Sequence, residues 1–433
     1  MRAALRTSWL ALALVALPVS PPGAAAQTEP PAVRVVPPPP LSRFDAGLVR
    51  SLRRIRSRSG RRADDVFMKV GDSSTVSRGF LTCLARDEDL VLHGRDRLRP
   101  TLAHFRHGRA GRRDPFRRQS LAAAEGWSAR HVLTGHPSPL IQEVRAIRPR
   151  FAFVMNGGND VEGRDDRRYA RRMLRIVRTL MDNGVVPILN SLPPRPRDPE
   201  TYRWVRRYNG VSWAIARALR VPYLDYHQVM AALPRMGLAR DGVHPNVLID
   251  GSHGNACDFS PEGLTYGHNA RNLLALEALD RLRRTVVEGE GATERGLVRA
   301  RGEGTWASPR QIHALPFAEI ADTRDAPDAR IATYPPCADA DEGGAEVVYR
   351  LRVRSPLRVR ARAYPLDDAD IDLHLLRGRP EGSACVARGD RELEATIGPG
   401  TWWLTADSFA GSGAPREGEY LLLVEAVASP ASD

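Results

Sequence analysis

Lysine is almost absent from this sequence of 433 residues, in which Lys69 is the only one. The formal net charge of +13 therefore rests on arginine. Such a basic chain invites interpretation as a nucleic-acid binder, but zinc-finger spacing, a basic zipper and RNA-binding aromatic motifs are all missing from it. The sequence consequently predicts no nucleic-acid partner.

Long apolar runs are also missing, because no stretch after residue 26 has the roughly eighteen apolar residues that a membrane helix needs. Residues 1–26 begin with the positively charged Arg2 and Arg6, continue with a short apolar run and finish with small residues up to Ala26. This order is typical of a secretory signal peptide, here cut before Gln27. We therefore expect a secreted or periplasmic protein without a transmembrane anchor, the alternative being an uncleaved N-terminal anchor.

Cysteine is scarce, and no two of the four cysteines, Cys83, Cys257, Cys337 and Cys385, form a Cys-x-x-Cys pair. In an exported chain an even number of such cysteines favours disulfides over zinc. Three pairings are open from the sequence. If each of two domains closes its own bridge, Cys83 joins Cys257 and Cys337 joins Cys385.

The length and the apolar content are sufficient for two folded units. Residues 27–60, rich in Pro and Arg, are predicted to be a linker, since the prolines at 37–40 favour an extended spacer. Over residues 61–287 we expect strands at 66–71, 151–155, 185–189 and 221–225 and helices at 167–183, 201–219 and 270–286. This alternation predicts an α/β domain whose parallel sheet is covered on both faces.

A candidate nucleophile follows the first of these strands, in Gly71-Asp72-Ser73. A strand that ends abruptly at a glycine displays the next side chains at its carboxyl end, where open α/β sheets bind ligands. The alternative is an ordinary turn in which Asp and Ser only bond nearby backbone. Thr75 stands where the Gly-x-Ser-x-Gly elbow of the α/β-hydrolases needs glycine, so that motif is excluded.

Two later glycine-containing blocks could supply hydrogen-bond donors. Gly126 ends a segment of small residues. This segment could be a strand whose last residue, a glycine, allows the backbone to come close to a ligand, or it could be a plain loop. Asn159 follows Gly157 and Gly158 at the end of the strand expected at 151–155, where its amide could be aimed at a neighbouring site. Ordinary turns without a catalytic role contain the same residues, so neither block by itself indicates an active site.

A candidate base lies in a loop further along the chain. Asp241 and His244 are three residues apart, so the carboxylate can orient an imidazole that activates a hydroxyl group. Asp250 and His253 repeat this spacing and form a rival pair. A turn with a solvated histidine is the alternative for both pairs.

The four blocks, in this order, resemble the SGNH hydrolases, the GDSL-type esterases and lipases, over about residues 61–287. The resemblance implies a flavodoxin-like three-layer α/β/α fold and the hydrolysis of esters through an acyl-enzyme. It implies neither a metal nor a cofactor.

The resemblance also implies a role for each matching residue. Ser73 would be the nucleophile, His244 the general base and then the acid, and Asp241 the group that orients His244. The backbone N–H groups of Ser73 and Gly126 and the side-chain amide of Asn159 would form the oxyanion hole.

Residues 288–312 form a second predicted linker, after which residues 313–433 change to short alternating runs. Runs at 345–354, 357–363, 370–376, 401–405 and 420–427 are typical of an antiparallel β-sandwich. Asp370-Ile-Asp-Leu, Gly400-Thr-Trp-Trp and Gly418-Glu-Tyr resemble bacterial pre-peptidase C-terminal domains. This second resemblance implies an accessory module of secreted hydrolases that contacts cell surface or glycan and catalyses nothing.

Together these features predict a secreted serine esterase that acts on a lipid, an acylated carbohydrate or a small ester. Two alternatives stay open. One is a non-catalytic or weakly catalytic protein that binds cell-surface glycan or lipid on a degenerate SGNH fold. The other is an acyltransferase, because the same acyl-enzyme can pass its acyl group to another alcohol when water is excluded.

Overall fold

The computed structural model describes residues 31–427, apart from residues 59, 61, 252, 297–299, 327, 338–341 and 411–414. The predicted signal peptide, residues 1–26, lies outside the described residues. By its contacts, the chain from Ala32 onward forms one compact unit.

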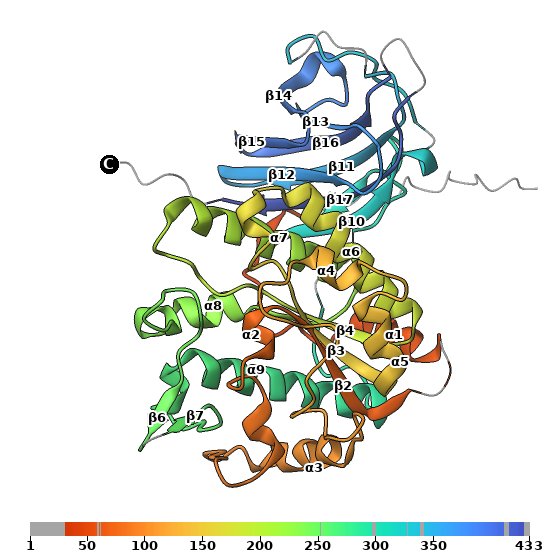
Figure 1. Cartoon of the computed structure of the whole chain (residues 1–433). Coiled ribbons are helices and arrows are strands. Elements are labelled where there is room, and N and C mark those ends of the chain that lie inside the picture. Colours follow the sequence, from red (N-terminus) through yellow and green to blue (C-terminus); the bar gives the residue numbers. More distant parts are fainter. Residues whose placement is uncertain are drawn as a thin grey trace, which may run out of the picture. The chain divides into compact units, whose positions relative to one another are not determined.

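A parallel four-stranded sheet organises the first half of this unit (Figure 1). Its strands, in spatial order, are β2 (Ala63–Gly71), β3 (Pro149–Met155), β4 (Val186–Asn190) and β5 (Tyr223–Leu224). The strands are nearly all buried, as expected when helices cover both faces of a parallel sheet. The predicted α/β domain is thereby confirmed.

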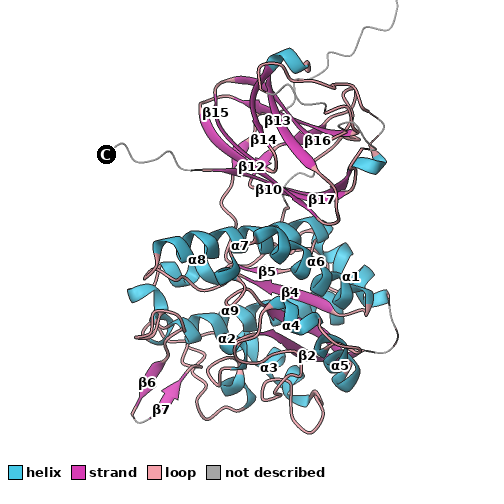
Figure 2. Ribbon diagram, turned by 45° about the horizontal axis from the view of Figure 1, so that its top comes forward, coloured by secondary structure: helices cyan, strands magenta, loops and turns pink. Residues whose placement is uncertain are grey.

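Figure 2 shows helices on both sides of this sheet. The longer ones are α1 (Ala46–Ser57), α3 (Arg99–His107), α5 (Pro139–Ile147), α6 (Asp166–Asp182), α7 (Pro199–Leu219) and α9 (Gly267–Leu282). Shorter elements near the carboxyl edge are α2 (Ser73–Val76), α4 (Ala129–Leu133), α8 (Tyr226–Ala231), β6 (Leu248–Asp250) and β7 (His253–Asn255). The helices expected at 167–183, 201–219 and 270–286 correspond to α6, α7 and α9.

The linker predicted over residues 27–60 is wrong for its second half. Residues 46–57 form α1, which begins where Asp45 accepts a hydrogen bond from the N–H of Leu48. Leu48, Leu52 and Ile55 of α1 are buried in the main core. Their spacing is that of an amphipathic helix, but the arginines of its solvent face led to its assignment as a basic linker.

Two further sheets make up the C-terminal half. One contains β10 (Phe317–Asp322), β17 (Glu419–Ala426), β12 (Leu357–Pro365) and β15 (Glu392–Ile397) in this order; the other contains β14 (Cys385–Gly389), β13 (Ile371–Arg377), β16 (Gly400–Ser408), β11 (Glu346–Val353) and β8 (Arg310–Ile312). All pairings are antiparallel except that between β8 and β11, and a core of buried residues lies between the sheets. This arrangement is consistent with the predicted β-sandwich, although β8 lies inside the predicted linker 288–312.

The sheet that contains β17 packs against the α/β half on one face and against the second C-terminal sheet on the other. Along β17, Leu421 and Leu423 belong to the core of the α/β half, whereas Tyr420, Leu422 and Val424 belong to the core between the two C-terminal sheets. Alternate side chains of a strand point to opposite faces, so one strand supplies both cores. The two halves therefore share buried apolar residues and pack directly against each other.

The N-terminal segment and two disulfides tie distant parts of the chain together. β1 (Arg34–Val35) pairs with β9 (Ala314–Leu315). Cys83 is bonded to Cys257, and Cys337 to Cys385, which confirms the predicted pairing. Within residues 31–427, as far as they are described, no helix is long and apolar enough to cross a membrane.

Candidate active site

The turn after β2 places Ser73 at the carboxyl edge of the sheet. Gly71 must be glycine here, because a Cβ atom would lie 2.5 Å from the carbonyl oxygen of Met155 on β3. Asp72 then accepts a hydrogen bond from the N–H of Ser74 at 3.2 Å and so begins α2. Ser73 is the first residue of this short helix and is partly exposed.

Ser73, His244 and Asp241 form a continuous hydrogen-bonded chain. Ser73 Oγ lies 3.1 Å from His244 Nε2, and His244 Nδ1 lies 2.7 Å from Asp241 Oδ2. The imidazole is 46% exposed, so a substrate can reach it from solvent. This is the geometry that general-base activation of a hydroxyl requires.

Asp241 is held as a carboxylate that can serve as the acceptor in this chain. Although partial burial opposes ionisation, hydrogen bonds from the N–H of Val243 and from His244 lower the pKa of Asp241 to about 2. The carboxylate therefore stays charged throughout the neutral range. An ionised acceptor fixes the proton of the neutral imidazole on Nδ1, which leaves the Nε2 lone pair facing Ser73.

The rival pair lies elsewhere. His253 is in β7, its side chain is 61% exposed, and its Nε2 lies 3.5 Å from Asp89. It forms no hydrogen bond with Ser73 in the part of the chain that the structure describes.

The two expected oxyanion blocks meet each other at the same sheet edge. The amide of Asn159 donates a hydrogen bond to the carbonyl oxygen of Trp127 at 2.9 Å, directly after Gly126. The segment before Gly126 forms a single bridge, Gly71 to Ala123, so of the two alternatives open from the sequence the loop describes it better than the strand. Gly126 has φ +71°, a conformation that favours glycine. The donors of both blocks are thus anchored to the strand end that carries Ser73.

A fully buried arginine, missed in the sequence, supports the nucleophile turn. Arg271 of α9 donates to the carbonyl oxygen of Ser74 at 2.6 Å and stacks over the ring of Phe80 at 3.7 Å. Burial lowers the pKa of Arg271 to about 10, and burial raises that of Asp72 to about 6. No local sequence pattern predicts the position of Arg271, because the residues that it contacts lie almost 200 residues away in the chain.

A second arginine holds the loop that carries Asp241 and His244. Arg197, in the loop after β4, donates to the carbonyl oxygen of Asp241 at 2.7 Å and to that of Arg240. Its side chain covers Gly242, where a Cβ atom would lie 2.6 Å from Arg197 Nε. The glycine of the Asp-Gly-Val-His block therefore serves this close approach.

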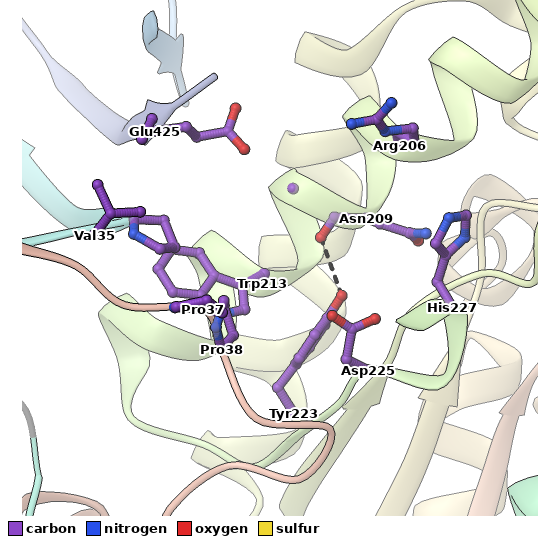
Figure 3. Close-up of a pocket in the computed structure, with 13 residues that line it drawn as sticks. Val35, Pro37, Pro38, Arg206, Asn209, Trp213, Tyr223, Asp225, His227 and Glu425 are labelled. Carbon is purple, nitrogen blue, oxygen red and sulfur yellow. Dashed lines mark hydrogen bonds between the residues drawn. The ribbon is translucent and has the colours of Figure 1, made fainter. Parts of the chain in front are cut away.

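Metal and cofactor sites are not evident in the described residues. No group of three or more His, Cys, Asp or Glu side chains among them is placed to hold a metal ion. A cavity does lie between α7, α8, β17 and the N-terminal segment (Figure 3), and its lining includes neither Ser73, His244 nor Asp241.

Comparison with known proteins identifies the α/β half. Residues 69–248 match the GDSL-like Lipase/Acylhydrolase family, so this segment is a GDSL-type hydrolase domain, and the protein is a serine hydrolase that acts on ester bonds. No curated protein matches the chain.

Several solved structures are similar to about half of the chain. TesA is 15% identical, with 51% of this chain and 99% of that one covered and a TM-score of 0.33. The acetylxylan esterase Axe2 from Geobacillus stearothermophilus is 17% identical, with 54% of this chain and 99% of that one covered and a TM-score of 0.33. The esterase EstA from Pseudoalteromonas sp. is 13% identical, with 51% of this chain and 98% of that one covered and a TM-score of 0.33.

Proposed function

We propose that Ser73, His244 and Asp241 are the catalytic triad of a secreted esterase that hydrolyses carboxylic esters. The observation that carries this proposal is the hydrogen-bonded chain from Ser73 Oγ through the imidazole to Asp241. Ser73 follows β2, whereas Asp241 and His244 lie in the loop before β6. A serine hydroxyl is a weak nucleophile unless an oriented base lies within hydrogen-bond reach.

The reaction follows from the positions of the protons. Ser73 Oγ attacks the acyl carbon while its proton passes to His244 Nε2, and the alcohol leaves with that proton. Water then attacks the acyl-enzyme, again giving a proton to Nε2, and Ser73 recovers it as the acid departs. Asp241 stabilises the imidazolium in both halves.

Developing negative charge on the carbonyl oxygen needs fixed donors. The N–H groups of Ser73 and Gly126 and the free hydrogen of the Asn159 amide fill this role in the proposal. The bond from Asn159 to Trp127 supports it, because a donor fixed before the reaction costs no reorganisation in the transition state.

Export and the role of the C-terminal half belong to the same proposal. The charged, apolar and small-residue order of residues 1–26 supports a signal peptide, and two disulfides are typical of an oxidising compartment. The C-terminal half would be an accessory module of the pre-peptidase C-terminal type that contacts cell surface or glycan.

The test is labelling with a fluorophosphonate, followed by peptide mapping. A serine is phosphonylated efficiently only when a base and oxyanion donors activate it. We expect the label on Ser73, its complete loss in Ser73→Ala, and a rate lowered by several orders of magnitude in His244→Ala.

Two variants serve as matched controls. Ser74→Ala removes the neighbouring hydroxyl and His253→Ala the rival imidazole, and both should label like the unchanged protein. A folded protein that does not label, or one whose labelling depends on His253, would overturn the assignment.

A further inference from the structure

A cavity of about 330 Å³ lies outside the triad and is built from distant parts of the chain (Figure 3). Its walls come from Val35, Pro37 and Pro38, from α7 and the start of α8, and from Glu425 at the end of β17. A volume of this size is at the lower end of the range for sites that bind small molecules.

One side of the cavity is apolar and flat. Figure 3 shows the indole of Trp213 beside Val35, Pro37 and Pro38. Trp213 is only partly buried, and its indole N–H makes no hydrogen bond with any described residue. The cavity therefore offers an aromatic ring together with an unused donor.

The other side carries polar groups with spare hydrogen-bonding capacity. The guanidinium of Arg206 has neither a hydrogen bond nor an ion pair with a described residue. Asp225 uses Oδ1 to accept from Ser191 and from the N–H of Gln228, which leaves Oδ2 available. His227 bonds the carbonyl oxygen of Leu192 through Nδ1, which leaves Nε2 available.

Charge in the cavity is mixed and nearly balanced. The cavity wall contains the cation of Arg206 and the carboxylates of Asp225 and Glu425, and Glu425 is already paired with Arg362 at 2.9 Å. Neither a strongly acidic nor a strongly basic ligand is favoured by such a wall. A ligand with several hydroxyl groups and an apolar ring face matches both sides.

We propose that this cavity binds one end of a neutral oligosaccharide. The sugar ring packs on Trp213 and the prolines, and its hydroxyl groups bond Arg206, Asp225 and His227. The site is separate from the triad and contains a residue of the C-terminal half, so both halves contribute to binding.

Leu192 connects this cavity to the active edge. Asn209 and His227, which line the cavity, both bond the backbone of Leu192. On its other side, Leu192 Cδ1 lies 3.0 Å from where a Cβ atom on Gly157 would lie, two residues before Asn159. The residue that the cavity wall holds in place therefore also packs against the turn that carries Asn159.

Binding is tested by calorimetry with Ser73→Ala protein, so that turnover does not interfere. The ligands are xylohexaose, cellohexaose and mannohexaose, with a galacturonic acid oligomer as the acidic comparison. We expect saturable binding of at least one neutral oligomer, weakened at least tenfold by Trp213→Ala and by Arg206→Ala.

Two residues of the same helix, both outside the cavity, provide matched controls. Trp204→Ala and Arg203→Ala should leave the affinity unchanged, and the melting temperature of each variant verifies folding. Binding of no neutral oligomer, binding of the acidic oligomer alone, or affinity unchanged in both cavity variants would overturn the proposal. Fluorophosphonate labelling is independent of this cavity, so failure of the esterase assignment would be recognised separately.

Discussion

At the scale of single residues, the oxyanion role proposed for Asn159 is compatible with the bond that its amide already makes. One amide hydrogen is bonded to the carbonyl oxygen of Trp127, and the other is available for a substrate oxygen. Asn159→Ala should lower kcat by about 10²–10³-fold with little change in KM, as for loss of an oxyanion donor. Steady-state kinetics on a soluble ester checks this expectation. A change confined to KM would assign Asn159 to substrate binding instead.

Asp72 gives a second residue-scale prediction, on stability against pH. Burial raises the pKa of Asp72 to about 6, whereas an unfolded chain has the ordinary value near 4. Between these values the folded state holds a proton that the unfolded state releases, so this carboxyl lowers stability as pH rises from about 4 to about 6. Above pH 6 its contribution is constant.

The variant Asp72→Asn removes this titration and keeps a side chain that can cap α2. Relative to it, the unchanged protein should lose up to about 3 kcal/mol of unfolding free energy between pH 4 and pH 6. Urea unfolding at several pH values measures the difference. Parallel pH profiles for the two proteins would contradict it.

At the scale of elements, the loop after β4 holds the loop that carries His244, the proposed base. Arg197 bonds two carbonyl oxygens of the turn at residues 240–241 and covers Gly242. Arg197→Ala should reduce kcat by roughly tenfold through misplacement of His244, since small displacements of catalytic groups are costly. KM and the melting temperature should change little, because Arg197 is exposed.

Kinetics of Arg197→Ala beside Arg203→Ala, an exposed arginine of α7, tests this positioning role. A loss of kcat in both variants would indicate a general charge effect. A loss of melting temperature that parallels the loss of kcat would indicate a purely structural role.

Some helices and strands could be predicted from the sequence more accurately than others. The strands β2 to β4 are apolar runs bounded by turn residues, and such patterns are local. Helix α1 was missed because arginines obscured its apolar stripe. For the segment before Gly126 the sequence left a strand and a loop open, and in the structure the segment contributes only one bridge to β2. Its small residues suit either conformation, and the neighbouring strand end decides between them.

At the scale of the whole molecule, β17 makes the two halves depend on each other. Leu423 lies in the core of the α/β half and contacts Gly210 of α7, while its neighbour Leu422 faces the other core. Leu423→Ala should lower the unfolding free energy by about 2–5 kcal/mol, the usual cost of truncating a buried leucine. Loss of esterase activity and loss of tryptophan fluorescence should shift to lower denaturant together.

Val386→Ala, at a half-exposed position of β14, is the control and should change neither transition. Tryptophans lie in both halves, so independent unfolding would split the fluorescence change into two transitions, of which Leu423→Ala would shift only one. Such an outcome would contradict the shared core.

Local properties could be read from the sequence alone: the strand ends, the glycine turns, and the residue types that ester hydrolysis needs. These depend on neighbours within a few positions, so periodicity and turn chemistry reveal them. The choice of histidine could not be read with the same certainty, because Asp241–His244 and Asp250–His253 have identical spacing. Only the three-dimensional arrangement brings His244 within hydrogen-bond reach of a serine 171 residues earlier. The same holds for Arg271, Arg197 and the cavity beside Trp213, whose parts meet only because helices and sheets pack across long stretches of chain.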